Sequence, residues 1–195
     1  MTSTTDNHFL AQAVHDLGTA LWFGGSVMGI AGVNKSGQQL TTGIDKVRVA
    51  SSAWGRFAPA QWAGIAATLG TGLQLTRSNK GRLALQEGYG RVGTVKAALT
   101  VAGAGATAFA AYSGAKIGKL AEQASTGAGD LDVKDATLPS AGTPPEIVKW
   151  QARQRFTQAA VPALAGGVIV CNAWLVQAYR PMSTVKGLLG KLLPS

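Results

Sequence analysis

Two adjacent ionisable residues, His15 and Asp16, lie near the start of the first apolar segment and are the side chains best suited to chemistry. Histidine titrates near neutral pH, and an ionisable group inside an apolar segment indicates proton transfer or ligand binding. His8 precedes His15 by seven residues, which is two helical turns on the same face. The sequence therefore offers His15, Asp16 and His8 as candidates for handling protons or a metal ion.

Haem, copper and zinc are the cofactors that these histidines could bind. A b-type haem held by two histidines needs its ligands on facing helices, whereas both histidines of this chain belong to one segment. Haem would then require a dimer, a ligand from a partner, or a different axial residue. For copper or zinc, Met28 lies more than three turns from His15, and Met182 lies in the C-terminal tail. No cofactor is assigned, and the alternative is a structural role in which His15 and Asp16 lie at headgroup depth and pair with a basic loop residue.

Four long stretches without charge must position these residues. Only 14% of the 195 residues are charged, against roughly 25% in an ordinary soluble domain. About 20 residues cross a bilayer, and a soluble helix would carry charges on its outward face in every turn. The predicted spans cover residues 9–33, 57–75, 97–115 and 156–179. We therefore expect an all-α fold, an integral membrane four-helix bundle over residues 1–195, with a soluble bundle of buried helices as the alternative.

The segments outside the spans are predicted to lie beyond the membrane. Residues 116–155 should form an extramembrane loop, irregular in its middle, where Gly, Ser, Thr and Pro are frequent. A helix should begin near Glu146, because a proline directly before it is tolerated in a first helical turn. Apolar residues alternate with two lysines over residues 183–193, which indicates a short amphipathic C-terminal helix on the membrane surface.

The net charge of +9 is distributed between the apolar segments. That placement favours anionic lipid headgroups as partners and argues against nucleic acid. The loop between the second and third spans is short and basic, so the positive-inside rule places it and both termini in the cytoplasm. The residues expected to contact lipid headgroups are Arg77, Lys80, Arg82, Arg91, Arg180 and Lys186. We expect a multi-pass protein of the cell membrane.

Small residues recur within the spans at helical spacing. Such residues let helix backbones approach closely, which drives helix association where lipid provides no hydrophobic gain. The positions assigned to helix packing or to a partner face are Gly25, Gly29, Gly64, Gly72, Gly103 and Gly166. They can serve packing within the chain or docking of a second copy or another membrane subunit, and the sequence leaves both uses open. Polar side chains within the second and fourth spans can form hydrogen bonds between helices, namely Gln61, Gln74, Asn172 and Gln177.

The familiar enzyme motifs are not found. The sequence contains no G-x-S-x-G, no H-E-x-x-H and no P-loop. Residues 88–93 spell G-x-G-x-x-G, but they follow a basic loop and not a predicted strand, so a dinucleotide site is not expected. The favoured interpretation is a non-catalytic accessory or structural subunit of a membrane complex or homo-oligomer. The alternative is a transport or redox protein that uses His15 and Asp16 for protons, a metal or haem.

The first span also carries a resemblance to a known family. His15, Leu21, Trp22, Gly24 and Gly25 match a pattern in which a histidine early in the helix is followed by a Leu-Trp-x-Gly-Gly-like turn. This stretch resembles the opening helix of copper-resistance D-type bacterial membrane domains. The resemblance implies a four-helix membrane bundle and a metal-handling role for His15.

Overall fold

A computed structural model describes residues 4–81, 88–126 and 130–178 of the chain. Its four long helices are α1 (Thr4–Met28), α2 (Gly43–Ser78), α4 (Tyr89–Ser125) and α5 (Pro145–Gln177). A π-helix, η1 (Gly29–Asn34), continues α1, and a short 3-10 helix, η2 (Gly37–Gln39), follows it. The predicted all-α fold of four helices is confirmed, and the described residues contain one isolated β-bridge and no strand.

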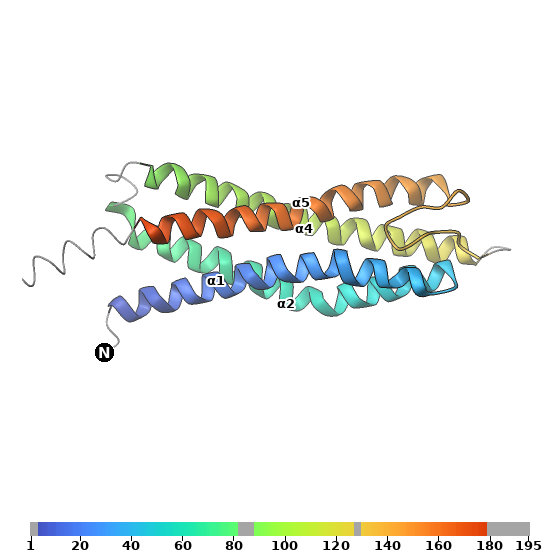
Figure 1. Ribbon diagram of the computed structural model, residues 1–195, viewed down its shortest axis with the longest axis horizontal. Coiled ribbons are helices and arrows are strands. Elements are labelled where there is room, and N and C mark those ends of the chain that lie inside the picture. The colour runs from blue at the N-terminus through green and yellow to red at the C-terminus, as the bar shows by residue number, and fades with distance from the viewer. Residues whose placement is uncertain (1–3, 82–87, 127–129, 179–195) are drawn as a thin grey trace, which may run out of the picture.

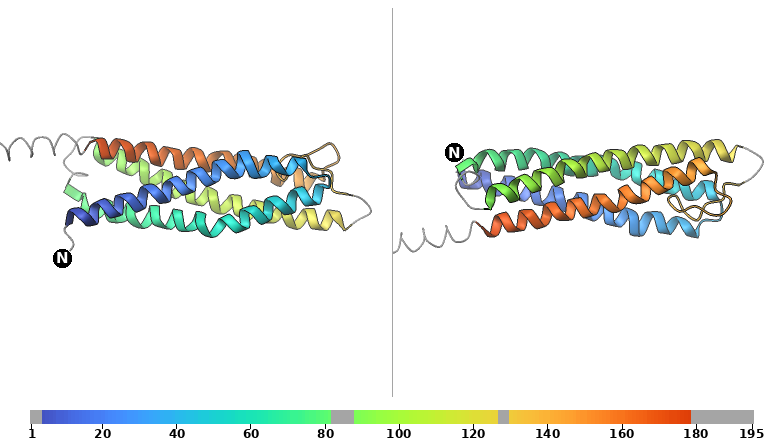
Figure 2. Two further views of the ribbon diagram at one scale, coloured as in Figure 1. Left: turned by 60° about the horizontal axis from the view of Figure 1, so that its bottom comes forward. Right: turned by 90° about the horizontal axis from the view of Figure 1, so that it is seen from above.

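The four helices lie lengthwise beside one another in an elongated bundle (Figure 1). α1 packs on α2, α4 packs on α5, and these two helical hairpins face each other along the bundle (Figure 2). One end, here called the terminal end, gathers the start of α1, the end of α2, the start of α4 and the end of α5. The opposite end, here called the loop end, holds η1, η2 and the connection between α4 and α5.

The helices extend beyond the predicted spans at the loop end. α2 begins at Gly43, and α4 continues to Ser125, past Lys116 and Lys119. α5 begins at Pro145, as expected from the proline before Glu146. About half of the predicted loop 116–155 is therefore helical, because lysine and glutamate are good helix formers and a charge that ends an apolar stretch does not end a helix.

Residues 130–144, between α4 and α5, form an irregular segment that is held in place by hydrogen bonds. Its centre is the buried carboxylate of Asp135, whose side chain is 1% exposed. Asp135 Oδ1 accepts hydrogen bonds from the backbone N–H of Thr137 at 2.7 Å and of Leu138 at 2.8 Å. Asp135 Oδ2 accepts a hydrogen bond from Gln38 Nε2 at 2.8 Å. These bonds fix the segment onto η2, so its lack of regular secondary structure is not a lack of defined contacts.

Among the described residues, two helices, α4 and α5, are long and apolar enough to cross a membrane by length and composition. The described parts of α1 and α2 are not apolar enough. The prediction of four membrane-spanning helices is therefore supported by length and composition for two of the four. Gly, Ser, Thr and Gln lower the hydropathy of α1 and α2. In α4 and α5 only 22% and 28% of the apolar window is buried inside the bundle, whereas the core helix of a soluble protein would be mostly buried.

Candidate functional site

His15 lies on the face of α1 that packs against α2, with its side chain 1% exposed. Its Nδ1 is 3.0 Å from the carbonyl oxygen of Thr68 and 3.3 Å from Thr71 Oγ1. A carbonyl oxygen only accepts, so Nδ1 carries the hydrogen that this contact needs. Nε2 is then left with its lone pair, and no described residue donates a hydrogen bond to it. His15 therefore presents one buried nitrogen that can accept a proton or ligate a metal.

Asp16 belongs to a different set of contacts, on the neighbouring face of α1. Its Oδ1 accepts hydrogen bonds from Gln12 Nε2 at 2.9 Å and from Asn172 Nδ2 of α5 at 2.6 Å. Asn172 Oδ1 in turn accepts a short hydrogen bond from Lys96 Nζ of α4. The Asn172 amide thus bridges an acid on α1 and a lysine on α4. The expected basic partner of Asp16 is reached through an amide, and this chain of side chains ties three helices together.

The structure does not bring the remaining metal candidates to His15. His8 is exposed near the start of α1, and Met28 is 65% exposed at the end of that helix. Met182 lies outside the described residues. Within residues 4–81, 88–126 and 130–178, no group of three or more His, Cys, Asp or Glu side chains could hold a metal ion. A metal ion bound at His15 would therefore need ligands other than the His, Cys, Asp and Glu side chains of the described residues.

The predicted headgroup contacts lie at the terminal end of the bundle where they can be described. Arg77, Lys80 and Arg91 are exposed at the end of α2 and the start of α4. The other three, Arg82, Arg180 and Lys186, fall outside the described residues, as does the predicted amphipathic helix over 183–193.

All six predicted packing glycines contact neighbours within the chain. A Cβ placed on any of them would lie between 1.9 and 3.4 Å from another side chain or backbone atom. The facing groups, in order, are Phe57 for Gly25, Trp54 for Gly29, the Gly18 carbonyl for Gly64, His15 for Gly72, Trp22 for Gly103 and Phe23 for Gly166. These positions are therefore occupied by packing inside the bundle. Glycines that face open space are found elsewhere among the described residues, at Gly24, Gly55, Gly70, Gly81 and Gly105.

The interior of the bundle is rich in polar side chains. The inward face of α5 shows this best, because its buried positions include Gln151, Gln154, Gln158 and Asn172 at helical spacing. Most of the buried polar groups pair across helices. Trp22 Nε1 donates to Thr107 Oγ1 at 3.1 Å, Asn34 Nδ2 to Gln158 Oε1 at 2.8 Å, and Gln61 Nε2 to Ser26 Oγ at 3.1 Å. Of the four residues predicted to form hydrogen bonds between helices, Gln61 and Asn172 do so, whereas Gln74 and Gln177 are exposed and show no such bond to a described residue.

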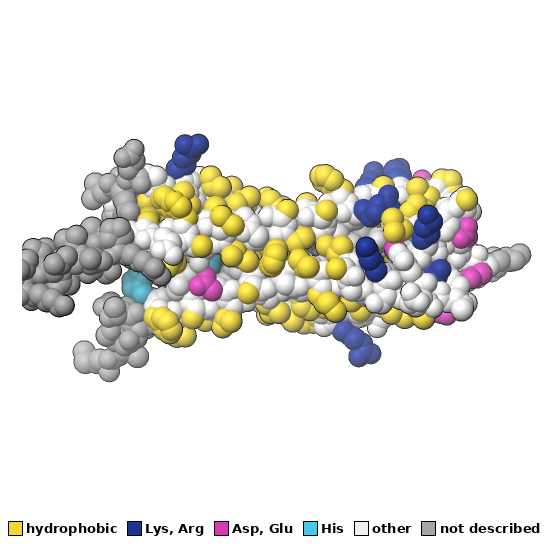
Figure 3. Space-filling model, viewed as in Figure 1, with side chains coloured by type: hydrophobic (Ala, Val, Ile, Leu, Met, Phe, Trp, Pro, Cys, Tyr) yellow, Lys and Arg dark blue, Asp and Glu magenta, His cyan; other side chains and the backbone are white. Residues whose placement is uncertain are grey.

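The outer surface shows the opposite character. On the face seen in Figure 3, apolar side chains are spread among uncharged ones over the middle of the bundle and toward the terminal end, while charged residues gather mainly at the loop end. The most exposed apolar side chains among the described residues, all at least 60% exposed, are Phe9, Leu10, Leu17, Met28, Val101, Phe156 and Val170. Such a surface is costly in water, where contiguous apolar patches on monomeric proteins are small.

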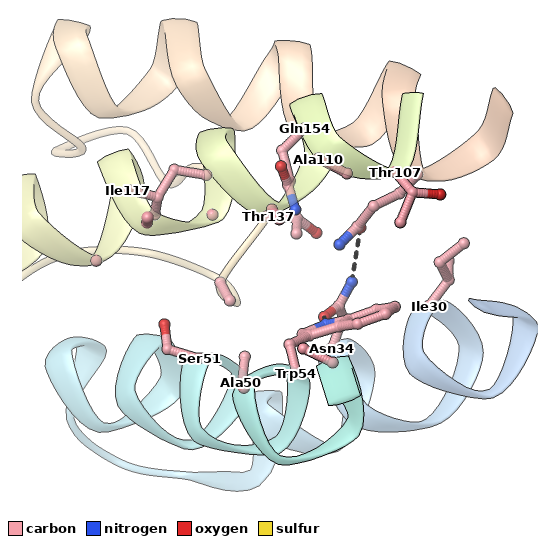
Figure 4. A pocket seen from close by; sticks show the side chains of 18 of the residues that line it. Ile30, Asn34, Ala50, Ser51, Trp54, Thr107, Ala110, Ile117, Thr137 and Gln154 are labelled. Atoms are coloured by element: carbon pink, nitrogen blue, oxygen red, sulfur yellow. Dashed lines mark hydrogen bonds between the residues drawn. The ribbon is translucent and has the colours of Figure 1, made fainter. Parts of the chain in front are cut away.

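A cavity of about 470 Å³ separates the two hairpins toward the loop end. One wall is formed by α2 around Ala50 and Trp54, and the opposite wall by α4 around Ala110 and Ile117 (Figure 4). No lining residue carries a charge. The sequence did not point to this cavity, because its walls come from alanines and glycines of helices that are far apart along the chain. Asn34 and Gln154 also line the cavity. Their spacing in the sequence is that of any inward-facing helical residues, so it does not indicate a binding site.

No family model, curated protein or solved structure matches the chain. The resemblance of the first helix to copper-resistance D-type domains stays a prediction. Of its residues, Trp22 is fully buried, Gly25 faces Phe57, and Gly24 faces open space.

Proposed function

We propose that the chain is an integral membrane protein whose four helices all cross the bilayer, and that it acts as a non-catalytic accessory subunit of a membrane complex or homo-oligomer. The observation that carries the membrane placement is the distribution of polarity, with amides and hydroxyls inside and large apolar side chains outside. In water this arrangement would expose apolar surface and desolvate polar groups. In a bilayer the same arrangement is favourable, because lipid covers the surface and the interior groups satisfy one another.

The charge-free belt of the bundle matches a bilayer in thickness. About 20 residues separate Arg56 from Arg77 on α2, and a similar number separate Lys96 from Lys116 on α4. At 1.5 Å per residue each stretch is about 30 Å long, the thickness of the hydrocarbon core. This agreement supports α2 as a span although its own hydropathy is low. A polar helix is tolerated in a membrane when its polar groups face other helices, as Gln61 and Thr68 do.

The subunit role is supported by two glycines that face outward from the bundle. Its interior polar groups are largely paired within the chain, whereas Gly24 and Gly105 face open space on two different helices. Outward glycines allow another transmembrane helix to approach closely. We expect a second copy or another membrane subunit to pack there.

Two measurements test this function. Alkaline carbonate washing of native membranes should leave the chain in the pellet. In a Cys171→Ala background, Gly105→Cys should form disulfide-linked or bismaleimide-linked adducts in membranes, while Gly103→Cys, which faces the interior, should not. Recovery of the chain in the soluble fraction would refute the membrane placement. A monomer in mild detergent with no adduct from Gly24→Cys or Gly105→Cys would refute the subunit role.

A second function is favoured by one observation, the unpartnered Nε2 of buried His15. A buried imidazole with a free lone pair is suited to relay protons or to ligate a metal or haem, and Asp16 lies beside it in sequence. The purified chain would then show a haem absorption band, stoichiometric metal, or proton flux in vesicles that His15→Ala abolishes and His8→Ala does not. Absence of all three signals in the unmodified chain would eliminate this alternative.

A further inference from the structure

The cavity between the hairpins exists because small residues face each other across it. On α4 its wall is built from Ala110, Ala111, Gly114, Ala115 and Gly118, and on α2 from Ala50, Ser51, Gly55 and Ala58. Along α4 the lining runs from Thr107 to Gly118, which is about 16 Å of helix at 1.5 Å per residue. The volume of about 470 Å³ falls within the range of small-molecule sites. The space is therefore elongated and large enough for a molecule of lipid type.

Several polar side chains of the cavity are hydrogen-bonded to one another or to a neighbouring helix. Asn34 is bonded to Gln158 and accepts a hydrogen bond from Trp54 Nε1 at 3.0 Å. Gln61 is bonded to Ser26. Gln154 is 6% exposed, and no described residue donates a hydrogen bond to its Oε1. Its side chain extends from α5 into the space between α4 and α2 (Figure 4).

We infer that this cavity binds a neutral lipophilic alcohol, whose hydroxyl group pairs with the Gln154 amide and whose apolar body lies along the alanines and glycines of α4. The absence of charged residues among the lining residues selects a neutral ligand, since a charge would lose its hydration there without a counter-ion. A hydroxyl both donates and accepts, so it pairs with the amide in either orientation of the Gln154 side chain. The aromatic faces of Trp54 and Trp62 complete the apolar lining.

This site goes beyond the proposed subunit function and does not depend on it, because the cavity is formed entirely within one chain. A membrane phospholipid acyl chain is the competing occupant. It would use the apolar walls equally well but would have no hydrogen bond to Gln154. The hydroxyl is therefore the feature that a binding experiment must isolate.

Three brominated probes of equal chain length separate these occupants, namely a ten-carbon alcohol, the matching carboxylate and the matching alkane. Each is titrated into the full-length protein in phosphatidylcholine vesicles, and quenching of tryptophan fluorescence is followed, because Trp54 and Trp62 line the cavity. We expect saturable quenching by the alcohol. Quenching by the alkane should be at least tenfold weaker, because the buried amide is left unpaired. The carboxylate should quench no more than it does in a control of protein-free vesicles with free tryptophan. Equal quenching by the alcohol and alkane would overturn the inference in favour of an acyl chain, and no saturable quenching would overturn it outright.

Variants of the same chain locate the probe. Gln154→Leu removes the amide at nearly constant volume and should abolish the preference for the alcohol over the alkane. Gly114→Leu fills the cavity and should weaken the alcohol by tenfold or more. Gly70→Leu adds the same side chain to α2 where nothing lies within 4 Å, and it should bind like the wild type. Unchanged alcohol binding by both Gln154→Leu and Gly114→Leu would place the probe elsewhere and refute the site. The comparison of probes on the wild type stands even if a variant fails to fold.

Discussion

Gly18 of α1 and Gly64 of α2 meet backbone to backbone where the two helices cross. A Cβ on Gly18 would lie 2.7 Å from the Gly64 carbonyl oxygen, and a Cβ on Gly64 would lie 2.8 Å from the Gly18 carbonyl oxygen. Real Cβ atoms do not come this close to another heavy atom, so both positions require glycine for helix α1 to approach α2. His15 and Thr68 both lie about one turn from the crossing toward the terminal end, and the contact between them depends on the same approach of the two helices.

Gly18→Ala should destabilise the bundle by about 1–3 kcal/mol, because a methyl group that does not fit forces the two backbones apart. Gly24→Ala is the matched control on the same helix, since nothing lies within 4 Å of its Cβ position. The control should be neutral or slightly stabilising, because alanine favours a helix over glycine. Thermal unfolding in detergent, followed by circular dichroism, measures both changes. Equal melting temperatures for the two variants would contradict the close crossing.

Asn172→Leu should destabilise the terminal end of the bundle. The substitution removes the acceptor of Lys96 and a donor to Asp16, and a buried polar group left without its partner costs about 1–3 kcal/mol. Gln177→Leu makes the same change at an exposed position of α5 and should have little effect. Chemical unfolding of the two variants measures the difference. In a Lys96→Met background the effect of Asn172→Leu should shrink, and an unchanged effect would show that Lys96 and Asn172 are not coupled.

Asp135 should be required for the contacts of residues 130–144. Asp135→Ala leaves the N–H groups of Thr137 and Leu138 and the amide of Gln38 without their acceptor, so it should expose the segment to proteolysis and faster hydrogen exchange. Asp135→Asn keeps one carbonyl-type oxygen and should be affected much less. Asp132→Ala is the control, because the exposed Asp132 side chain accepts a single hydrogen bond from the described residues, from the Gly142 N–H at 3.0 Å. Equal exchange rates in Asp135→Ala and Asp132→Ala would contradict the central role of Asp135.

The ion pair between Arg48 of α2 and Glu122 of α4 should make stability depend on pH. Two hydrogen bonds of 2.7 Å join the side chains, and the guanidinium lowers the pKa of Glu122 from its ordinary value of 4.5. A carboxyl group with a lowered folded pKa stabilises the fold above its unfolded pKa, and this contribution is lost as the pH falls through the folded pKa. The pair is half exposed, so the effect should be small.

The difference in melting temperature between the wild type and Glu122→Gln should therefore be present at neutral pH and shrink as the pH falls below 4.5. The control is the same substitution in an Arg48→Gln background, where this dependence should disappear. A difference that stays constant down to pH 3 would show that Glu122 is not stabilised by Arg48.

The sequence was sufficient to predict the helices but not how their faces meet. Charge-free stretches such as the one between Arg56 and Arg77 predict the four long helices correctly in number and type, because each stretch forms the apolar part of one helix. The helix ends were less predictable, since Lys116 and Lys119 belong to α4 and only the Gly- and Pro-rich segment after Ser125 interrupts the helical backbone.

The candidate site was predictable only in part for a related reason. His15 and Asp16 stand out because ionisable groups are rare in such a segment. Their partners, Thr68 and Asn172, are ordinary residues 53 and 156 positions away, and nothing local in the sequence distinguishes them from other inward polar residues. The pairing depends on which helices become neighbours in the fold. A single sequence does not show which helices these are.

Polar side chains join the two hairpins to each other at several points beside the apolar contacts. Trp22 bonds to Thr107, Asn34 to Gln158, and Asp16 to Asn172, and each pair takes one residue from either half of the chain. Such directional bonds define a register that apolar contacts alone would leave loose. Two separately synthesised halves, divided between Ser78 and Tyr89, should accordingly recognise each other and recombine into the native bundle, and each half should discriminate against a foreign hairpin that lacks the complementary amides.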